Sequence, residues 1–162
     1  MKGDECIDSE IVVKAILEEH YDPQANRFSP RLFRGPESSL SRLVIWSKKK
    51  IIEAFIEQLH NPPDNFLMGI GIAEVGTLKK ICIEYQKKRT VITVIEDPLD
   101  GSQEDHIINP AHAIIPQKLS DGLAKTIPTK INIEWGSIEK LLANAEEKKG
   151  CRGFLFSRLT IL

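Results

Sequence analysis

The chain has 162 residues, of which 41% are hydrophobic and 28% charged, enough for one domain with its own core. Its 22 basic and 23 acidic side chains nearly cancel and only 6% of residues are aromatic, which argues against nucleic acid as a partner. Three widely spaced cysteines without a Cys-x-x-Cys pair, and no long apolar run, indicate a cytoplasmic protein without a membrane partner.

The N-terminal part of the chain reads as a helix followed by a long turn region. The first eight residues are polar, and we expect them to be flexible. Ser9 can cap a helix that runs to about His20, because apolar side chains recur at helical spacing at Ile11, Val12, Ala15 and Ile16. Residues 24–39 are rich in turn formers and hold at most a short helical turn near 31–33.

The central part alternates between strands and helices. Residues 40–46 contain a β-rich run and predict a strand. Ser47 then caps a helix whose apolar stripe ends with Leu59, before the helix stop at residues 60–64. Residues 66–72 predict a strand. Thr77 then caps a predicted helix that has Leu78, Ile81, Cys82 and Tyr85 on one face.

The last part continues this alternation. Residues 90–95 are mostly β-branched and predict a buried strand, and residues 97–109 a polar loop. The elements expected after that loop are a short strand at 111–115, a helix at 119–127, a strand at 131–135, a helix from Ser137 and a strand at 154–162.

This order of elements predicts an α/β or α+β fold. We expect a single compact domain, with a mixed sheet of about five or six strands and helices packed on it. Residues 1–8 would be a flexible N-terminus and residues 9–162 the domain. Within the domain, residues 25–116 would form the core and residues 117–162 a C-terminal extension.

Cofactor and metal motifs are incomplete. Gly69-Ile70-Gly71 starts like a dinucleotide fingerprint, but Glu74 occupies the place of the third glycine. Glycines at a crowded strand-to-helix corner explain the pattern better. The histidines are dispersed, and a metal site built from His106 and His112 is the minor alternative. We therefore predict neither a metal nor a cofactor.

One segment gathers arginines and hydroxyl groups before a predicted strand. Arg27, Arg31 and Arg34 are followed by Ser39, Ser41 and Arg42. Because guanidinium groups bind phosphate and carboxylate through a rigid fork, Arg34, Arg42 and Ser41 are candidate anion-binding residues. The alternative is a surface loop whose arginines pair with nearby acids, and it is the more common arrangement.

A second segment, Asn109-Pro110-Ala111-His112-Ala113, places a histidine between two alanines after a rigid turn. Functional histidines need both a fixed position and free space. His112 is therefore a candidate catalytic residue. The alternative is a histidine whose hydrogen bonds are satisfied in the core.

These segments together resemble a group of small uncharacterised bacterial proteins. The shared features are a Phe-Arg stretch at 28–34, a Leu-Ser element at 40–41, a glycine-containing strand leading into a helix at 69–78, and a Pro-Ala-His-Ala segment at 110–113. The resemblance covers about residues 25–116. It implies a bacterial origin and draws attention to Arg34, Ser41, Glu74 and His112, without implying an activity.

Two functions follow as hypotheses. The first is an accessory or interaction protein in a larger assembly, which binds another protein or a second copy through an edge strand at residues 153–162. The second is a metal-independent enzyme acting on a nucleotide or RNA phosphate. There Arg34 or Arg42 would hold the anion, and His112 would be the general acid or base with help from Glu74. The enzyme hypothesis requires His112 and Arg34 to meet at one cleft.

Overall fold

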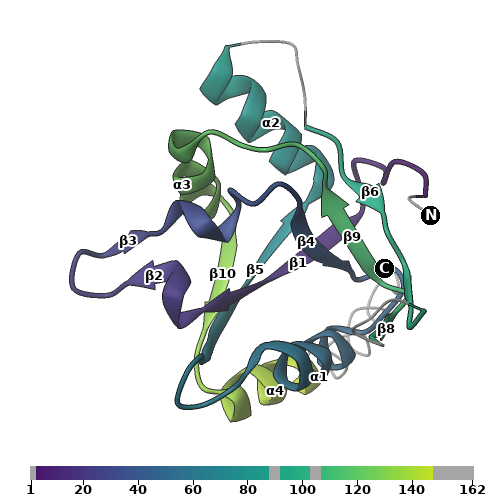
Figure 1. The fold of residues 1–162 in the computed structure, drawn as a ribbon, viewed down its shortest axis with the longest axis vertical. Coiled ribbons are helices and arrows are strands. Elements are labelled where there is room, and N and C mark those ends of the chain that lie inside the picture. The colour runs from purple at the N-terminus through teal and green to yellow at the C-terminus, as the bar shows by residue number, and fades with distance from the viewer. Residues whose placement is uncertain (1–2, 88–91, 103–106, 148–162) are drawn as a thin grey trace, which may run out of the picture.

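The computed structural model describes residues 3–87, 92–102 and 107–147 and shows an α+β domain built on one sheet (Figure 1). The sheet has six strands in the order β10-β5-β1-β4-β9-β6. Every pairing between them is antiparallel, so the sheet is antiparallel rather than mixed. The strands are β1 (Ile11–Leu17), β4 (Ser38–Arg42), β5 (Leu67–Glu74), β6 (Ile95–Glu96), β9 (His112–Ile115) and β10 (Asn132–Trp135).

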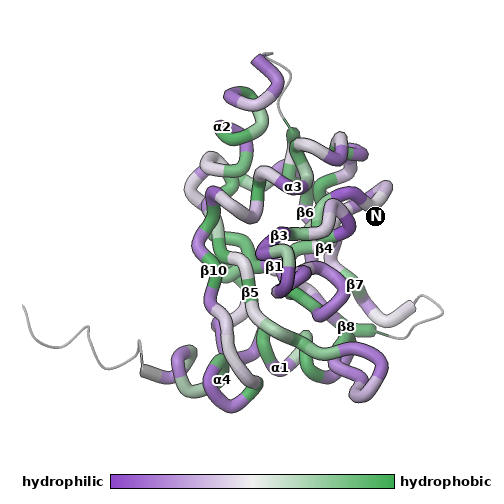
Figure 2. The backbone as a smooth tube through the Cα atoms, turned by 90° about the vertical axis from the view of Figure 1, so that its left-hand side faces the viewer, coloured by the Kyte–Doolittle hydropathy of each residue, from purple (hydrophilic) through white to green (hydrophobic). Residues whose placement is uncertain are grey.

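Two pairs of helices cover the two faces of this sheet (Figure 1). The helices α1 (Lys48–Leu59) and α4 (Ile138–Glu147) pack on one face, and α2 (Val75–Gln86) and α3 (Asp121–Lys130) on the other. Each face has its own core cluster of buried apolar side chains. The hydrophobic colouring accordingly follows the inner strands, while connecting segments are more hydrophilic (Figure 2).

Two small hairpins flank the sheet. The first joins β2 (Tyr21–Asp22) to β3 (Arg27–Phe28) and lies between the 3-10 helices Glu18–His20 and Pro30–Leu32. The second joins β7 (Leu99–Asp100) to β8 (Ile108–Asn109). Within the described ranges, no helix is long and apolar enough to cross a membrane.

The structure corrects the predicted N-terminal helix. Residues Ile11–Leu17 form β1, the strand between β4 and β5. Because both faces of a central strand are buried, its apolar residues need not alternate with polar ones. The resulting run of apolar residues also fits helical spacing, which is why the helix prediction was wrong.

Smaller differences concern where elements begin and end. The strand expected at 40–46 is β4, which ends at Arg42, and the chain then turns, since the Trp46 amide donates to the Arg42 carbonyl. Helix α2 begins at Val75, not after Thr77, because β5 runs directly into it. Of the described residues of the strand expected at 90–95, only Ile95 is in a strand. Its first two residues and the strand at 154–162 lie outside the described residues.

The expected division into segments also changes. Residues 3–8 are held by backbone hydrogen bonds, such as Cys6 N–H to the Val94 carbonyl at 2.8 Å, and the Cys6 side chain is buried. Beyond residue 116, α3 contributes to one core cluster and β10 pairs with β5. Elements on both sides of the expected 25–116 core therefore belong to the same sheet and its helices.

Candidate functional site

A partly open cavity of about 310 Å³ lies between α1 and the face of the sheet that α1 covers. Its size is at the lower end of the range for small-molecule sites. Its apolar wall consists of Ala15, Leu17, Leu40, Phe55, Leu59, Leu99 and Ile107. Its polar lining consists of Lys14, His20, Ser39, Ser41, Gln58, Asn109 and His112. Two residues predicted from the sequence, Ser41 and His112, therefore line the same cavity.

The ring of His112 is fixed by Asp97, which follows the edge strand β6. The Nδ1 atom of His112 lies 2.9 Å from the Asp97 carbonyl oxygen and 3.1 Å from its carboxylate Oδ2. Because a carbonyl oxygen only accepts hydrogen bonds, Nδ1 carries the proton in this arrangement. With the proton on Nδ1, a neutral ring would carry its lone pair on Nε2, to which the described residues make no hydrogen bond.

Ser41 lies directly across from His112 in the β4–β9 ladder. Side chains opposite each other in an antiparallel pair lie on the same face of the sheet, about 5 Å apart at Cβ. Ser41 is a buried residue that lines the cavity, and its hydroxyl makes no hydrogen bond with any residue of the described chain. This hydroxyl is thus available to a molecule in the cavity.

Lys14 lines the cavity at the gap between β1 and β4, although its side chain leaves β1 on the face of Val12 and Ile16, where its Nζ atom lies 5.8 Å from the Phe33 ring centroid. The β1–β4 ladder has only two residue pairs, ending at Val13 with Ser41. Next to this end, the Lys14 Nζ atom donates to the Ser39 carbonyl at 3.0 Å. Burial lowers the pKa of the Lys14 ammonium to about 8. At neutral pH the ammonium group is therefore still mostly protonated, but its charge is poorly solvated by water.

His20 is held in its neutral form. Its Nδ1 accepts a hydrogen bond from the Leu17 amide at 3.1 Å, so Nε2 carries the proton. Burial, together with the nearby Lys14 charge, lowers the pKa of His20 to about 4. At neutral pH, His20 therefore adds a dipole to the cavity wall, but no charge.

Arg42 does not serve this cavity. Because neighbouring residues of a strand point to opposite faces, its side chain leaves the sheet on the face opposite that of Ser41. There its guanidinium bonds Glu10 through Nε at 2.8 Å and Glu96 through Nη1 at 2.7 Å. The proposed role of Arg42 as an anion clamp is not supported, since two carboxylates already occupy it.

Arg34 and Glu74 also lie elsewhere. Arg34 pairs with Asp121 at the start of α3, 3.1 Å from Nε to Oδ1, and α3 packs on the face of the sheet opposite the one that α1 covers (Figure 1). It lines a separate hollow with Lys118. Glu74 is exposed where β5 meets α2. The single cleft with His112 and Arg34 that the enzyme hypothesis required is therefore absent from the described structure.

Three residues of the site were missed from the sequence: Lys14, His20 and Asp97. The first had a visible signal, since Lys14 is the one charged residue in the run Ile11–Leu17. Asp97 lies fifteen residues from His112. Only the pairing of β6 with β9 brings the two together, and that pairing could not be derived from the sequence.

Within the described ranges, no three histidine, cysteine, aspartate or glutamate side chains are grouped to hold a metal ion. His106 lies outside those ranges, so the minor alternative of a site with His112 has no structural description. The chain matches no protein-family model, no curated protein and no solved structure. Its function must therefore be argued from the cavity itself.

Proposed function

We propose that the protein binds a small organic anion with a short apolar chain in this cavity, and that His112 acts as general acid or base toward it. The observation that supports this is the position of His112: Asp97 holds its Nδ1 atom, and its ring lines a partly open and largely apolar cavity. Histidines used for proton transfer need such a fixed ring with one free nitrogen.

The charge of the ligand follows from Lys14. With a pKa of about 8, the ammonium is mostly protonated at pH 7. Because it is buried, its attraction to a partner anion is stronger than that of an ammonium on the surface. Carboxylate is the simplest group that would pair with it. The apolar wall, which includes Leu17, Phe55 and Leu59, would take the hydrocarbon part of the ligand.

This proposal keeps one part of the enzyme hypothesis and replaces another. His112 retains the role of acid or base, and Ser41 that of a hydrogen-bonding group beside it. Lys14 replaces the two arginines as the anion-binding group, because both arginines pair with carboxylates elsewhere.

Hexanoate should bind this protein at pH 7, and its affinity should fall about 30-fold by pH 9.5. The reason is that an amine with a pKa of about 8 keeps roughly 3% of its charge at pH 9.5, whereas an ordinary lysine, with a pKa near 10.5, would keep most of it. Ligand-observed NMR with hexanoate at both pH values measures the change. Hexanol, which has the same chain and no charge, should bind weakly and equally at both.

Two variants control this experiment. Lys14→Met should abolish the preference for hexanoate over hexanol. Lys118→Met, in the separate hollow beside Arg34, should leave it unchanged. Equal binding of the acid and the alcohol to the unaltered protein, or hexanoate binding that survives Lys14→Met, would contradict the proposal.

A second candidate function is association with another protein or a second copy. It is favoured by Val44 and Ile45, consecutive apolar residues in the turn after β4 that are 64% and 44% exposed. If this turn is an interface between copies, sedimentation velocity should show a dimer that a Val44→Ser, Ile45→Ser variant loses. A monomer at all concentrations would contradict the hypothesis of self-association. The edge strand first expected at 153–162 lies outside the described residues.

A further inference from the structure

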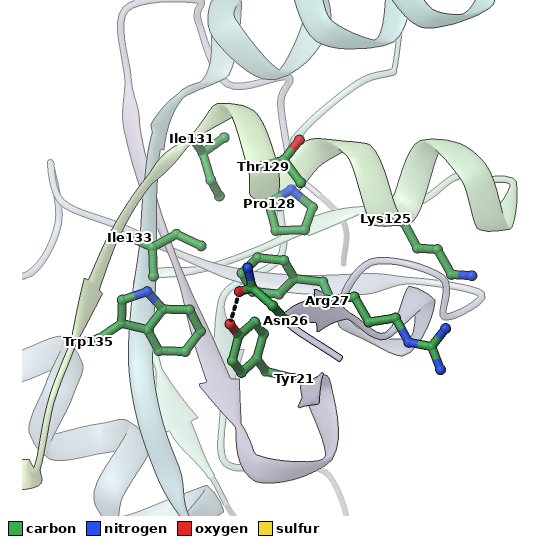
Figure 3. Close-up of a pocket in the computed structure, with 10 residues that line it drawn as sticks. Tyr21, Asn26, Arg27, Lys125, Pro128, Thr129, Ile131, Ile133 and Trp135 are labelled. Carbon is green, nitrogen blue, oxygen red and sulfur yellow. Dashed lines mark hydrogen bonds between the residues drawn. The ribbon is translucent and has the colours of Figure 1, made fainter. Parts of the chain in front are cut away.

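A second hollow, of about 490 Å³, lies between the β2–β3 hairpin, α3 and β10 (Figure 3). Three aromatic side chains meet there. The ring centroids of Tyr21 and Trp135 are 4.8 Å apart, and those of Phe28 and Trp135 are 5.8 Å apart with nearly parallel planes. Trp135 is 37% exposed. The low aromatic content of the chain gave no sign of this cluster, because its members come from three separate strands.

Two cations border the same hollow. Arg27 and Lys125 both extend to the right in Figure 3, away from Trp135 on the left. Arg27 is 73% exposed on its side chain, and its nearest acid, Asp22, lies 4.0 Å away. Lys125 makes no ion pair with any residue in the described ranges. The charged residues that line this hollow are Arg27 and Lys125, and no acidic side chain of the described residues lines it.

A smaller polar hollow of about 330 Å³ adjoins the aromatic one and shares Tyr21, Arg27, Phe28 and Lys125 with it. It also exposes the carboxylates of Glu19 and Asp22. Glu19 faces Arg31 at 3.6 Å, and Asp22 Oδ1 accepts from two amides of the hairpin turn. The two hollows thus place an aromatic surface, two cations and hydroxyl-accepting carboxylates side by side.

The hairpin that carries Tyr21 and Phe28 is ordered by its own contacts. Asp22 accepts the amides of Gln24 and Ala25 at 3.0 Å each. Asn26 adopts a left-handed backbone with φ of 47°, and its side-chain oxygen accepts from the Tyr21 hydroxyl. A surface fixed in this way loses little conformational entropy when a ligand binds.

We propose that this hollow binds a nucleotide. The base would lie on the aromatic cluster, since every base offers a flat π-face to aromatic side chains. The phosphate would lie at Arg27 and Lys125, because guanidinium and ammonium groups bind phosphate oxygens. The carboxylates of the adjoining hollow would accept the ribose hydroxyls, as acidic residues do in nucleotide sites. The same chemistry is offered by a free nucleotide and by the end of a single strand.

Fluorescence of Trp135 tests this binding directly. The chain has two tryptophans, so Trp46→Phe leaves Trp135 as the only one. In that background AMP should quench the emission saturably, and adenosine at least ten-fold more weakly. Should Trp46→Phe not fold, the Trp135 indole signal in a ¹H–¹⁵N spectrum of the unaltered chain reports the same titration. A tetranucleotide binding at least ten-fold tighter than AMP would assign the site to a strand end, and equal or weaker binding would assign it to the free nucleotide.

Matched variants separate the phosphate contact from general electrostatics. Arg27→Ala combined with Lys125→Ala should reduce AMP affinity at least ten-fold, to that of adenosine. Lys130→Ala should not change it, because Lys130 is on the same helix but faces Glu84 at 3.8 Å. Absence of saturable quenching by AMP at millimolar concentration, an equal response to inorganic phosphate alone, or an equal loss with Lys130→Ala would overturn the proposal.

Discussion

Replacing Arg42 by methionine is expected to lower the free energy of unfolding by about 3–5 kcal/mol. The Arg42 side chain is 10% exposed and bonds the Glu10 carboxylate, itself 12% exposed, as well as Glu96. Breaking a buried ion pair by removing one partner costs about 3–5 kcal/mol, because the remaining charge loses both its partner and its water. Urea unfolding of both proteins measures the difference.

Arg34→Met is the matched control for this prediction. Arg34 also pairs with an acid, but it is 47% exposed and Asp121 is 57% exposed. An exposed pair contributes about 0–1 kcal/mol, so the variant should unfold almost like the unaltered protein. If the two variants lost the same free energy of unfolding, the charges of Glu10 and Glu96 would not need Arg42 to be stable in the folded protein, which would contradict the prediction. Hexanoate binding should be unaffected by Arg34→Met, since Arg34 does not line the cavity.

Replacing Gly69 by alanine is expected to cost about 1–3 kcal/mol and to shift β10. A Cβ at this position would lie 2.7 Å from the Glu134 carbonyl oxygen and 3.1 Å from Cε3 of Trp135. Backbone atoms cannot move aside as a side chain does, so the paired strand must separate locally. Thermal unfolding measures the cost, and the Trp135 fluorescence should change because the ring is displaced.

Gly71→Ala, two residues along the same strand, controls for the effect of alanine in a strand. A Cβ there would meet Cδ1 of Ile131 at 2.9 Å, the end of a flexible side chain that can rotate away. This variant should therefore be nearly neutral. If Gly71→Ala were as costly as Gly69→Ala, close approach of the β10 backbone would not be the reason for glycine at position 69.

Local signals in the sequence predicted the helices with clear ends. Ser47 caps α1, as expected, by accepting a hydrogen bond from the Lys50 amide, and α1 ends at Leu59. The short strand before Pro116 and the strand ending at Trp135 are also present. These elements were accessible because caps, prolines and periodic apolar residues act within a few positions of one another.

Pairing between distant strands was not accessible in this way. The sequence could mark Ser41 and His112 as unusual, but their meeting depends on the β4–β9 register. Alternation within the expected strand at 40–46 already implied that Ser41 and Arg42 point to opposite faces, but which of the two shares a face with His112 depends on that register. Neither Arg34 nor Arg42 lines the cavity of His112, because strand order rather than proximity along the chain decides which residues meet there.

The nitrogen signals of the His112 ring test the central claim most directly. In ¹⁵N-labelled protein at about pH 8, His112 should carry its proton on Nδ1, while His20 and His60, whose Nδ1 atoms accept backbone amides, should carry theirs on Nε2. Adding hexanoate should shift the His112 Nε2 signal in the unaltered protein and not in Lys14→Met. A proton on Nε2 of His112, or hexanoate binding that leaves this signal unmoved, would contradict the assignment of His112 as the acid–base group of the cavity.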